Sequence, residues 1–202
     1  MENVREHNRK MKQFFDNCAE NWDNKCSHNS DKLAAIVTLA GIRKGFRVAD
    51  IACGTGVLFP EILKREPELL LGIDLSDEML KKAREKFAQP NIRLYAGDLF
   101  DVAETGFDAA FLYSAYPHFP DKPALAQQVS RMLKPRGRFL IAHSESRERI
   151  NLRHQGREVS GLSWPLRPAR EEAAVWERWF SIDLLADNDE FYLISGTKSD
   201  MG

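Results

Sequence analysis

The sequence lacks the long apolar run that a membrane-spanning helix requires. None of its 202 residues fall in a stretch that approaches the roughly 18 consecutive apolar residues needed to cross a bilayer. The first residues, MENVREHNRKMK, also lack the apolar core of a secretory signal. We therefore expect a cytoplasmic protein without a membrane partner.

An excess of charge of one sign is also missing. The 29 Lys and Arg residues nearly balance the 30 Asp and Glu residues, and the formal net charge is -1. A near-neutral chain has no overall attraction for the phosphates of nucleic acid. Cysteine is scarce as well: Cys18, Cys26 and Cys53 form no Cys-x-x-Cys pair. We therefore expect reduced thiols, no bound metal and no nucleic-acid partner.

Apolar runs of strand length alternate with helical patterns between about residues 46 and 145. This alternation predicts an α/β fold with a parallel sheet covered by helices. Ser76 and Asp121 stand where each would cap one of the helices. The five predicted strands are Phe46–Ala52, Leu69–Asp74, Ile92–Ala96, Ala109–Tyr113 and Phe139–His143.

The two ends of the chain follow other patterns. After His143 the sequence predicts a helix over about 168–178 and an antiparallel hairpin of Phe180–Ala186 and Phe191–Thr197. Before the sheet, residues 1–40 read as a helical extension that ends with a helix over Asp31–Ala40. We expect this extension to be a lid and residues 41–202 to form the main domain, so that the chain is one globular protein.

A glycine loop follows the first predicted strand. In VADIACGTGVL, residues 48–58, the strand runs into Gly54–Thr55–Gly56 and then into a helix. Glycines at such a place let the backbone approach a ligand closely and adopt positive φ. A tight turn without a ligand is the alternative interpretation.

Acidic residues end the next two predicted strands. Asp74 in LGIDLS can accept hydrogen bonds from both hydroxyls of a ribose, and Asp98 in AGDLFD can accept one from an adenine amine. Each carboxylate could instead cap the following helix. Because the carboxyl ends of parallel strands share one edge of a sheet, the combination with the glycine loop favours a nucleoside site.

These motifs resemble those of class I S-adenosylmethionine-dependent methyltransferases, most closely the small enzymes related to the type 11 and quinone-ring methyltransferases. The resemblance implies a Rossmann-like three-layer sandwich, with a seven-stranded, mostly parallel sheet whose last strand is antiparallel. It also implies S-adenosylmethionine as cofactor and S-adenosylhomocysteine as product. The matching segments are VADIACGTG, GIDLS, AGDLF, FDAAFLYSAYPHF and LKPRGRFLIAH.

The resemblance assigns cofactor roles position by position. Ala52 stands where the family's loop has its first glycine, and we expect it to keep negative φ. Ala52 and Phe59 occupy the first and third glycine positions of the dinucleotide-binding fingerprint, so a dinucleotide site is not expected. The implied cofactor residues are Asp50, Ala52, Cys53, Gly54, Thr55 and Gly56 for the methionine part, Asp74, Leu75 and Met79 near the ribose, Asp98 and Leu99 for the adenine, and Tyr113 and Ser114 beneath the sulfonium.

Histidines at strand ends are the best candidates for acid–base chemistry. His118 in YSAYPHF and His143 at the end of the fifth strand should lie near each other, with Tyr116 as a third catalytic candidate. His118 could instead be a loop histidine bonded to backbone. If Ser144–Glu158 forms a helix, His154 shares a face with Ile150 and Arg157 and joins the cluster. We favour a hydrogen-bonding substrate site over a metal site for the three histidines.

Arginines and aromatic residues suggest the nature of the acceptor. Six arginines and no lysine lie between Arg147 and Arg170, and arginine forks suit carboxylate or phosphate. Arg147 and Arg153 are thus candidate substrate contacts, unless Glu145 and Glu148 balance them on a helix face. The aromatic candidates are Phe14, Phe15 and Trp22 for a hydrophobic lid, with Trp22 near the substrate, and Trp164 beside Pro165 for a planar acceptor.

Taken together, these patterns predict a methyltransferase for a small-molecule acceptor, planar or acidic. The alternative is a protein that binds S-adenosylmethionine as a sensor or accessory subunit without methyl transfer. We expect a monomer or a homodimer.

Overall fold

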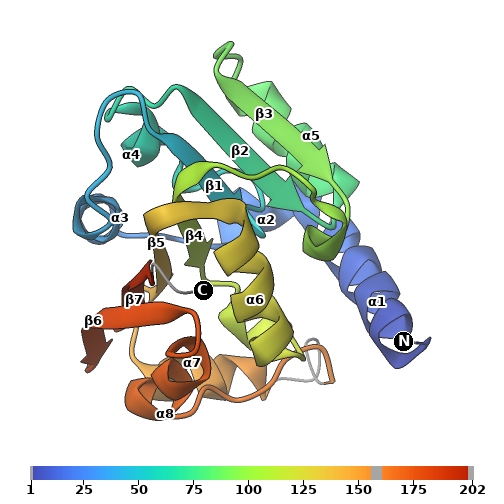
Figure 1. Cartoon of the computed structure of the whole chain (residues 1–202). Helices are drawn as coiled ribbons and strands as arrows, with labels where there is room; N and C mark the ends of the chain where they lie inside the picture. Colours follow the sequence, from blue (N-terminus) through green and yellow to red (C-terminus); the bar gives the residue numbers. More distant parts are fainter. Residues whose placement is uncertain (1, 156–160, 200–202) are drawn as a thin grey trace. The chain divides into compact units, whose positions relative to one another are not determined.

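The computed structural model of the protein describes residues 2–155 and 161–199 (Figure 1). The chain divides into two compact units, Met1–Ala103 and Glu104–Gly202. In the described part of the chain, no helix is both long and apolar enough to span a bilayer.

The first unit contains three parallel strands that share one edge for their carboxyl ends. Strand β2 pairs in parallel with β1 on one side and with β3 on the other. Helix α5 lies against β2 and β3 (Figure 1). The elements of the unit are α1 (Glu2–Cys18), η1 (Ala19–Asn21), α2 (Trp22–Lys25), α3 (Ser30–Leu39), β1 (Arg47–Ile51), α4 (Phe59–Leu63), β2 (Leu69–Asp74), α5 (Asp77–Lys86), β3 (Ile92–Ala96) and η2 (Leu99–Asp101).

The second unit contains the remaining strands. Strand β4 pairs in parallel with β5, and β7 runs antiparallel to both β5 and β6. The elements are β4 (Phe107–Tyr113), η3 (Tyr116–His118), α6 (Lys122–Met132), β5 (Leu133–His143), α7 (Arg147–His154), α8 (Ala169–Trp176), β6 (Phe180–Asp187) and β7 (Tyr192–Lys198).

The strand order of the seven-stranded sheet is β3-β2-β1-β4-β5-β7-β6. This order, with β7 antiparallel, confirms the predicted fold class. Two predicted helix caps are also present: the Ser76 hydroxyl accepts from the N–H of Met79, and the Asp121 carboxylate accepts from the N–H of Ala124. The predicted hairpin closes through Asn188, whose N–H donates to the Phe191 carbonyl at 3.0 Å.

Strand β5 and helix α7 differ most from their predicted bounds. Strand β5 begins at Leu133 rather than at Phe139, because Leu133 already pairs with Phe107 and the register then shifts. Arg136 makes this irregular step with a φ of 61°. Helix α7 begins at Arg147, after the N-cap Ser146, and ends at His154. The last part of the predicted Ser144–Glu158 helix, including Arg157, lies outside the described residues.

The core of the second unit is aromatic. Trp176 is fully buried, and its ring stacks on Phe139 with centroids 4.2 Å apart and planes 15° apart. Phe180 meets the same Phe139 ring edge-on at 4.6 Å. This packing anchors α8 against β5 and β6, and it fixes the position of the polar residues on α8.

Candidate functional site

The chain leaves β1 through a loop with three residues of positive φ. They are Ala52 (55°), Gly54 (56°) and Gly56 (82°). The expectation of negative φ at Ala52 is therefore wrong. The turn is held by the N–H of Cys53, which donates to the Ile73 carbonyl at 3.0 Å, and an L-residue in this region costs about 1–2 kcal/mol. The loop holds a strained shape that the rest of the unit must stabilise.

The two glycines of the loop serve different purposes. A Cβ on Gly54 would meet no atom within 4 Å, so the backbone there is open to approach by a ligand. A Cβ on Gly56 would lie 2.8 Å from Cδ2 of Phe59 and 3.0 Å from Phe87, so this glycine is required by packing. Cys53 is buried, and burial raises the pKa of its thiol well above the ordinary value. Its thiol therefore stays protonated and packs in the core.

Two buried carboxylates lie beside this loop. The Asp74 side chain accepts from the N–H of Gly54 and from that of Ser76, each at 2.8 Å, but burial still raises its pKa to about 6. Asp50 is 2% exposed, and its Oδ2 has no hydrogen-bond partner among the described residues. Burial and the charge of Asp74 raise the pKa of Asp50 well above its ordinary range. Buried, uncompensated carboxylates favour a cationic ligand.

The end of β3 offers a further acceptor. Asp98 caps η2 by accepting from the N–H of Phe100 at 3.0 Å, and its second oxygen accepts from Nδ2 of Asn8 at 2.5 Å. The capping role considered for this carboxylate is therefore present. Among the apolar candidates, Met79 and Leu99 are buried and Leu75 is half-buried.

The N-terminal segment makes one polar contact at each of the three strand ends. The hydrogen bonds join Asp23 to Thr55 at 2.5 Å after β1, Asp16 to Ser76 at 2.6 Å after β2, and Asn8 to Asp98 at 2.5 Å after β3. Sequence reasoning missed these three polar residues of the segment. Their spacing of eight and seven residues, two helical turns each, was the signal that could have identified them.

The aromatic residues of the segment pack on one another. The rings of Phe15 and Trp22 meet edge-on with centroids 5.5 Å apart, and Phe14 meets Phe15 in the same way at 5.2 Å. Trp22 is half-buried. The indole of Trp22 thus packs on an aromatic neighbour of the same segment.

In the second unit the structure brings the three predicted histidines together. The rings of His118 and His154 meet edge-on with centroids 5.1 Å apart. Burial, together with the smaller effects of the charges of His154 and His118, lowers the pKa of His143 to about 3. Two ring nitrogens, His143 Nε2 and His154 Nδ1, are buried without a partner among the described residues. No group of three metal-ligating side chains with metal-site geometry occurs in residues 2–155 and 161–199.

The three histidines differ in the proton chemistry that is open to them. His143 is neutral at pH 7 and a weak base, because its pKa lies near 3. The ring of His118 is oriented by a 2.9 Å hydrogen bond between Nδ1 and the Leu162 carbonyl. If Nδ1 carries the proton, as a carbonyl partner requires, Nε2 is the basic nitrogen. His118 is thus the better base, while His143 offers a hydrogen-bonding nitrogen.

The hydroxyl of Tyr116 is hydrogen-bonded to buried protein side chains. Its side chain is fully buried, and its hydroxyl donates to Oε2 of Glu172 at 2.9 Å and accepts from Nε1 of Trp176 at 3.3 Å. Burial and the charge of Glu172 raise its pKa. Both hydrogen bonds of the hydroxyl are thus with buried protein groups, and the hydroxyl positions Glu172; the catalytic role expected of Tyr116 stays a prediction.

The remaining candidates in this unit are held by local contacts. Tyr113 is buried, and its hydroxyl lies 2.8 Å from Oγ of Ser144. Ser114 is exposed, has a φ of 53°, and donates its N–H to the Ala142 carbonyl at 2.9 Å. Ser114 is thus the more accessible of the two residues assigned to the sulfonium.

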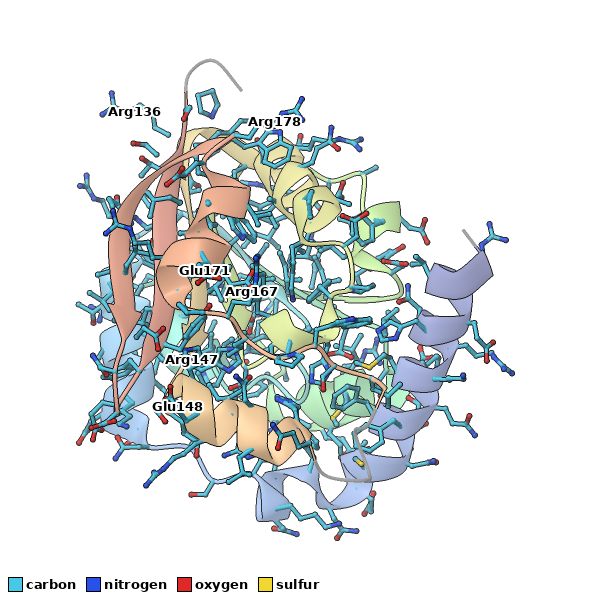
Figure 2. The ribbon with its side chains drawn as sticks, turned by 90° about the horizontal axis from the view of Figure 1, so that it is seen from below. Arg136, Arg147, Glu148, Arg167, Glu171 and Arg178 are labelled. Atoms are coloured by element: carbon cyan, nitrogen blue, oxygen red, sulfur yellow. The ribbon has the colours of Figure 1, made fainter. Side chains whose placement is uncertain are left out.

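The two arginines predicted to contact substrate are ion-paired. Arg147 pairs with Asp187 at 3.1 Å and with Glu148 at 2.8 Å, and Arg153 pairs with Glu145. Figure 2 shows Arg147 and Glu148 together at the start of α7. The balanced helix face considered as an alternative is therefore the arrangement present.

Comparison with known proteins finds similarity to methyltransferases over part of the chain. Residues 48–137 match the family model described as a methyltransferase domain. The chain is 36% identical over 101 residues to a demethylmenaquinone methyltransferase of Corynebacterium kroppenstedtii, a match that covers 49% of the chain and 42% of the relative. It is 35% identical over 103 residues to a ubiquinone biosynthesis O-methyltransferase of Xylella fastidiosa, with 48% and 42% covered. The chain thus spans less than half the length of these relatives.

Solved structures share the fold over nearly the whole chain. One comes from the complex of the Haloferax volcanii Trm112 methyltransferase activator with a methyltransferase: the TM-score is 0.76 at 18% identity, and 92% of this chain and 97% of that chain are covered. Another is the complex of DhpI with SAH, with a TM-score of 0.73, 18% identity, and 96% and 97% covered. At these identities the likeness is one of fold.

Proposed function

We propose that this chain, which carries a domain of the class I S-adenosylmethionine-dependent methyltransferase family, transfers a methyl group from S-adenosylmethionine to a small-molecule acceptor. The observation that carries this proposal is the buried Oδ2 of Asp50, which has no hydrogen-bond partner within residues 2–155 and 161–199 and lies beside the buried carboxylate of Asp74. S-adenosylmethionine bears an ammonium and a sulfonium, so it supplies the positive charge that this pair of carboxylates lacks.

The residues of the first unit fit such a cofactor. Asp50 would hold the ammonium, and the open backbone at Gly54 would lie along the methionine part. Asp74 would accept hydrogen bonds from the ribose hydroxyls. Each of its oxygens accepts only one backbone N–H and therefore keeps a second lone pair for a ligand. Asp98 would exchange its bond to Asn8 for one from the adenine amine. We further propose that residues 1–40 are a lid over these strand ends, supported by the three hydrogen bonds described above.

When bound, S-adenosylmethionine supplies a methyl carbon activated by positive sulfur: a lone pair of the acceptor forms the new bond to carbon while the carbon–sulfur bond breaks, and its electron pair remains on sulfur. The protein positions both partners and keeps water away. Nε2 of His118 removes the proton from an acceptor hydroxyl or amine. Nε2 of His143, which no group in the described part of the chain bonds, donates a hydrogen bond to the acceptor or accepts one from it while the ring stays neutral.

The names of the curated relatives support a small-molecule acceptor, since they refer to demethylmenaquinone and to ubiquinone biosynthesis. The test is a coupled assay for S-adenosylhomocysteine over a panel of phenols, carboxylates and amines. We expect at least one acceptor to give turnover that His118→Ala reduces by roughly 100-fold or more. Cofactor binding without product formation on any acceptor would instead favour a sensor or accessory protein.

A further inference from the structure

A pocket of about 360 Å³ opens in the second unit, and its lining includes Pro120, two residues after His118. Its volume falls within the range of roughly 300–1,000 Å³ that small-molecule sites occupy. The backbone of Trp164 ties its wall to the chain before His118, because the Trp164 N–H donates to the Pro117 carbonyl at 2.9 Å. The lining residues are Pro120, Lys122, Trp164, Pro165, Arg167 and Glu172.

One wall of the pocket is flat and apolar. Trp164 is 40% exposed, and it lines the pocket together with Pro120 and Pro165. Planar ligands stack on indole faces and gain about 0.5–1.5 kcal/mol beyond the burial of area. This wall favours an aromatic ligand over an aliphatic one.

The only carboxylate of this lining is already committed to interior partners. The side chain of Glu172 is 4% exposed; one oxygen accepts from the Tyr116 hydroxyl at 2.9 Å and the other from Nε of Arg167 at 3.0 Å. Arg167 itself is 53% exposed, so the outer edge of its guanidinium lies toward solvent. Figure 2 shows Arg167 beside α8. Glu172 thus orients Arg167 and does not fill the pocket.

Lys122 supplies a second positive charge to the pocket lining. Its ammonium donates to the Tyr116 carbonyl and lies 3.8 Å from the centroid of the Tyr116 ring. Among the described residues, no carboxylate forms an ion pair with it. The pKa of Lys122 is lowered to about 7, mainly by burial and to a lesser extent by the charge of Arg167, while the charge of Glu172 acts in the opposite direction. An anion in the pocket would complete this environment.

We infer that this pocket binds a planar aromatic carboxylate, with the ring on Trp164 and the carboxylate between Lys122 and Arg167. His118 lies two residues before Pro120 of the lining, and on this ground we assign the ligand as the methyl acceptor; in this respect the inference rests on the proposed function. Neither Lys122 nor Glu172 stood out in the sequence, because only the fold brings these residues together.

The binding test uses benzoate as probe, titrated calorimetrically into the full chain. Benzamide keeps the ring and removes the charge, and acetate keeps the charge and removes the ring. We expect saturable binding of benzoate that is roughly tenfold or more tighter than that of either control ligand. Equal binding of benzamide, equal binding of acetate, or no binding of benzoate overturns the inference.

Variants locate the site. Lys122→Met and Arg167→Met should each weaken benzoate binding by roughly tenfold or more, and Lys122→Arg should retain most of the affinity. Arg170→Met is the matched control, because Arg170 is exposed on α8 and does not line the pocket. Circular dichroism verifies that each variant is folded. Benzoate affinity that is unchanged in both methionine variants would overturn the site, and Trp164→Leu with full affinity would overturn the stacking.

Titration of S-adenosylmethionine into the same samples separates the two proposals. If the cofactor binds and benzoate does not, the pocket inference fails and the proposed function stands. If benzoate binds at Lys122 and the cofactor does not bind, the pocket stands as a ligand site and the proposed function fails.

Discussion

Replacing Asp74 with asparagine should change how the stability of the protein depends on pH. The carboxyl is buried, and its pKa rises from the ordinary value of 3.8 to about 6 in the folded chain. The folded state therefore binds this proton more tightly than the unfolded state does. The contribution of Asp74 to stability is fully present below pH 3.8 and is lost as the pH rises through about 6.

The magnitude follows from the two pKa values. Ionisation of Asp74 costs the folded state about 3 kcal/mol at about pH 7.5 and about 1.6 kcal/mol at about pH 5. Asparagine removes this cost but leaves the N–H of Gly54 or Ser76 without its acceptor, a loss of about 1–3 kcal/mol at either pH. The stability of Asp74→Asn relative to the wild type should therefore rise by about 1.4 kcal/mol from about pH 5 to about pH 7.5.

Urea unfolding of both proteins at the two pH values measures this change directly. Asp77→Asn is the matched control, since this carboxylate lies three residues away with a side chain that is 59% exposed. If the difference between Asp74→Asn and the wild type is the same at both pH values, Asp74 titrates as an ordinary carboxyl group and the reasoning fails.

Three further changes have defined outcomes. Tyr116→Phe removes a donor from buried Glu172 and an acceptor from Trp176, so urea unfolding should show a loss of about 2–4 kcal/mol, and an unchanged midpoint would contradict the network. Gly54→Ala should fold, with a free energy of unfolding that is lower by about 1 kcal/mol, but it should bind S-adenosylmethionine weakly. Gly56→Ala should lose more stability, because Phe59 blocks the new Cβ. Equal free energies of unfolding for the two variants would contradict this contrast. Benzoate binding should weaken as the pH rises through about 7, because Lys122 loses its charge beside Arg167, Glu172 and neutral Tyr116. The affinity of Lys122→Met for benzoate should not depend on pH in this way. A wild-type affinity that is constant across this pH range would contradict the role of Lys122.

Much of the fold could be predicted because it depends on local patterns. The bounds of β2 and β3 agree with the predicted strands, since polar residues and turns end both apolar runs. Ser76 and Asp121 cap their helices as expected. The clustering of Asp50, Gly54 and Asp74 also follows from the sequence, because carboxyl ends of parallel strands meet at one edge of a sheet.

What could not be predicted depends on contacts between distant segments. Tyr116 and Glu172 are 56 residues apart, and only the packing of Trp176 on Phe139 brings α8 to Tyr116. The same applies to the bonds from the N-terminal segment to Thr55, Ser76 and Asp98. The positive φ of Ala52 was missed for another reason: residue type gives only a preference, and the turn after β1 overrides it.

The most direct test of the central claim is calorimetric titration of S-adenosylmethionine into the wild type, Asp74→Asn and the control Asp77→Asn at about pH 7.5. We predict that the wild type and the control bind S-adenosylmethionine with equal affinity. The affinity of Asp74→Asn should be lower by roughly tenfold or more, because the ribose loses a charged acceptor. No binding to the wild type, or equal binding to all three proteins, would contradict the account.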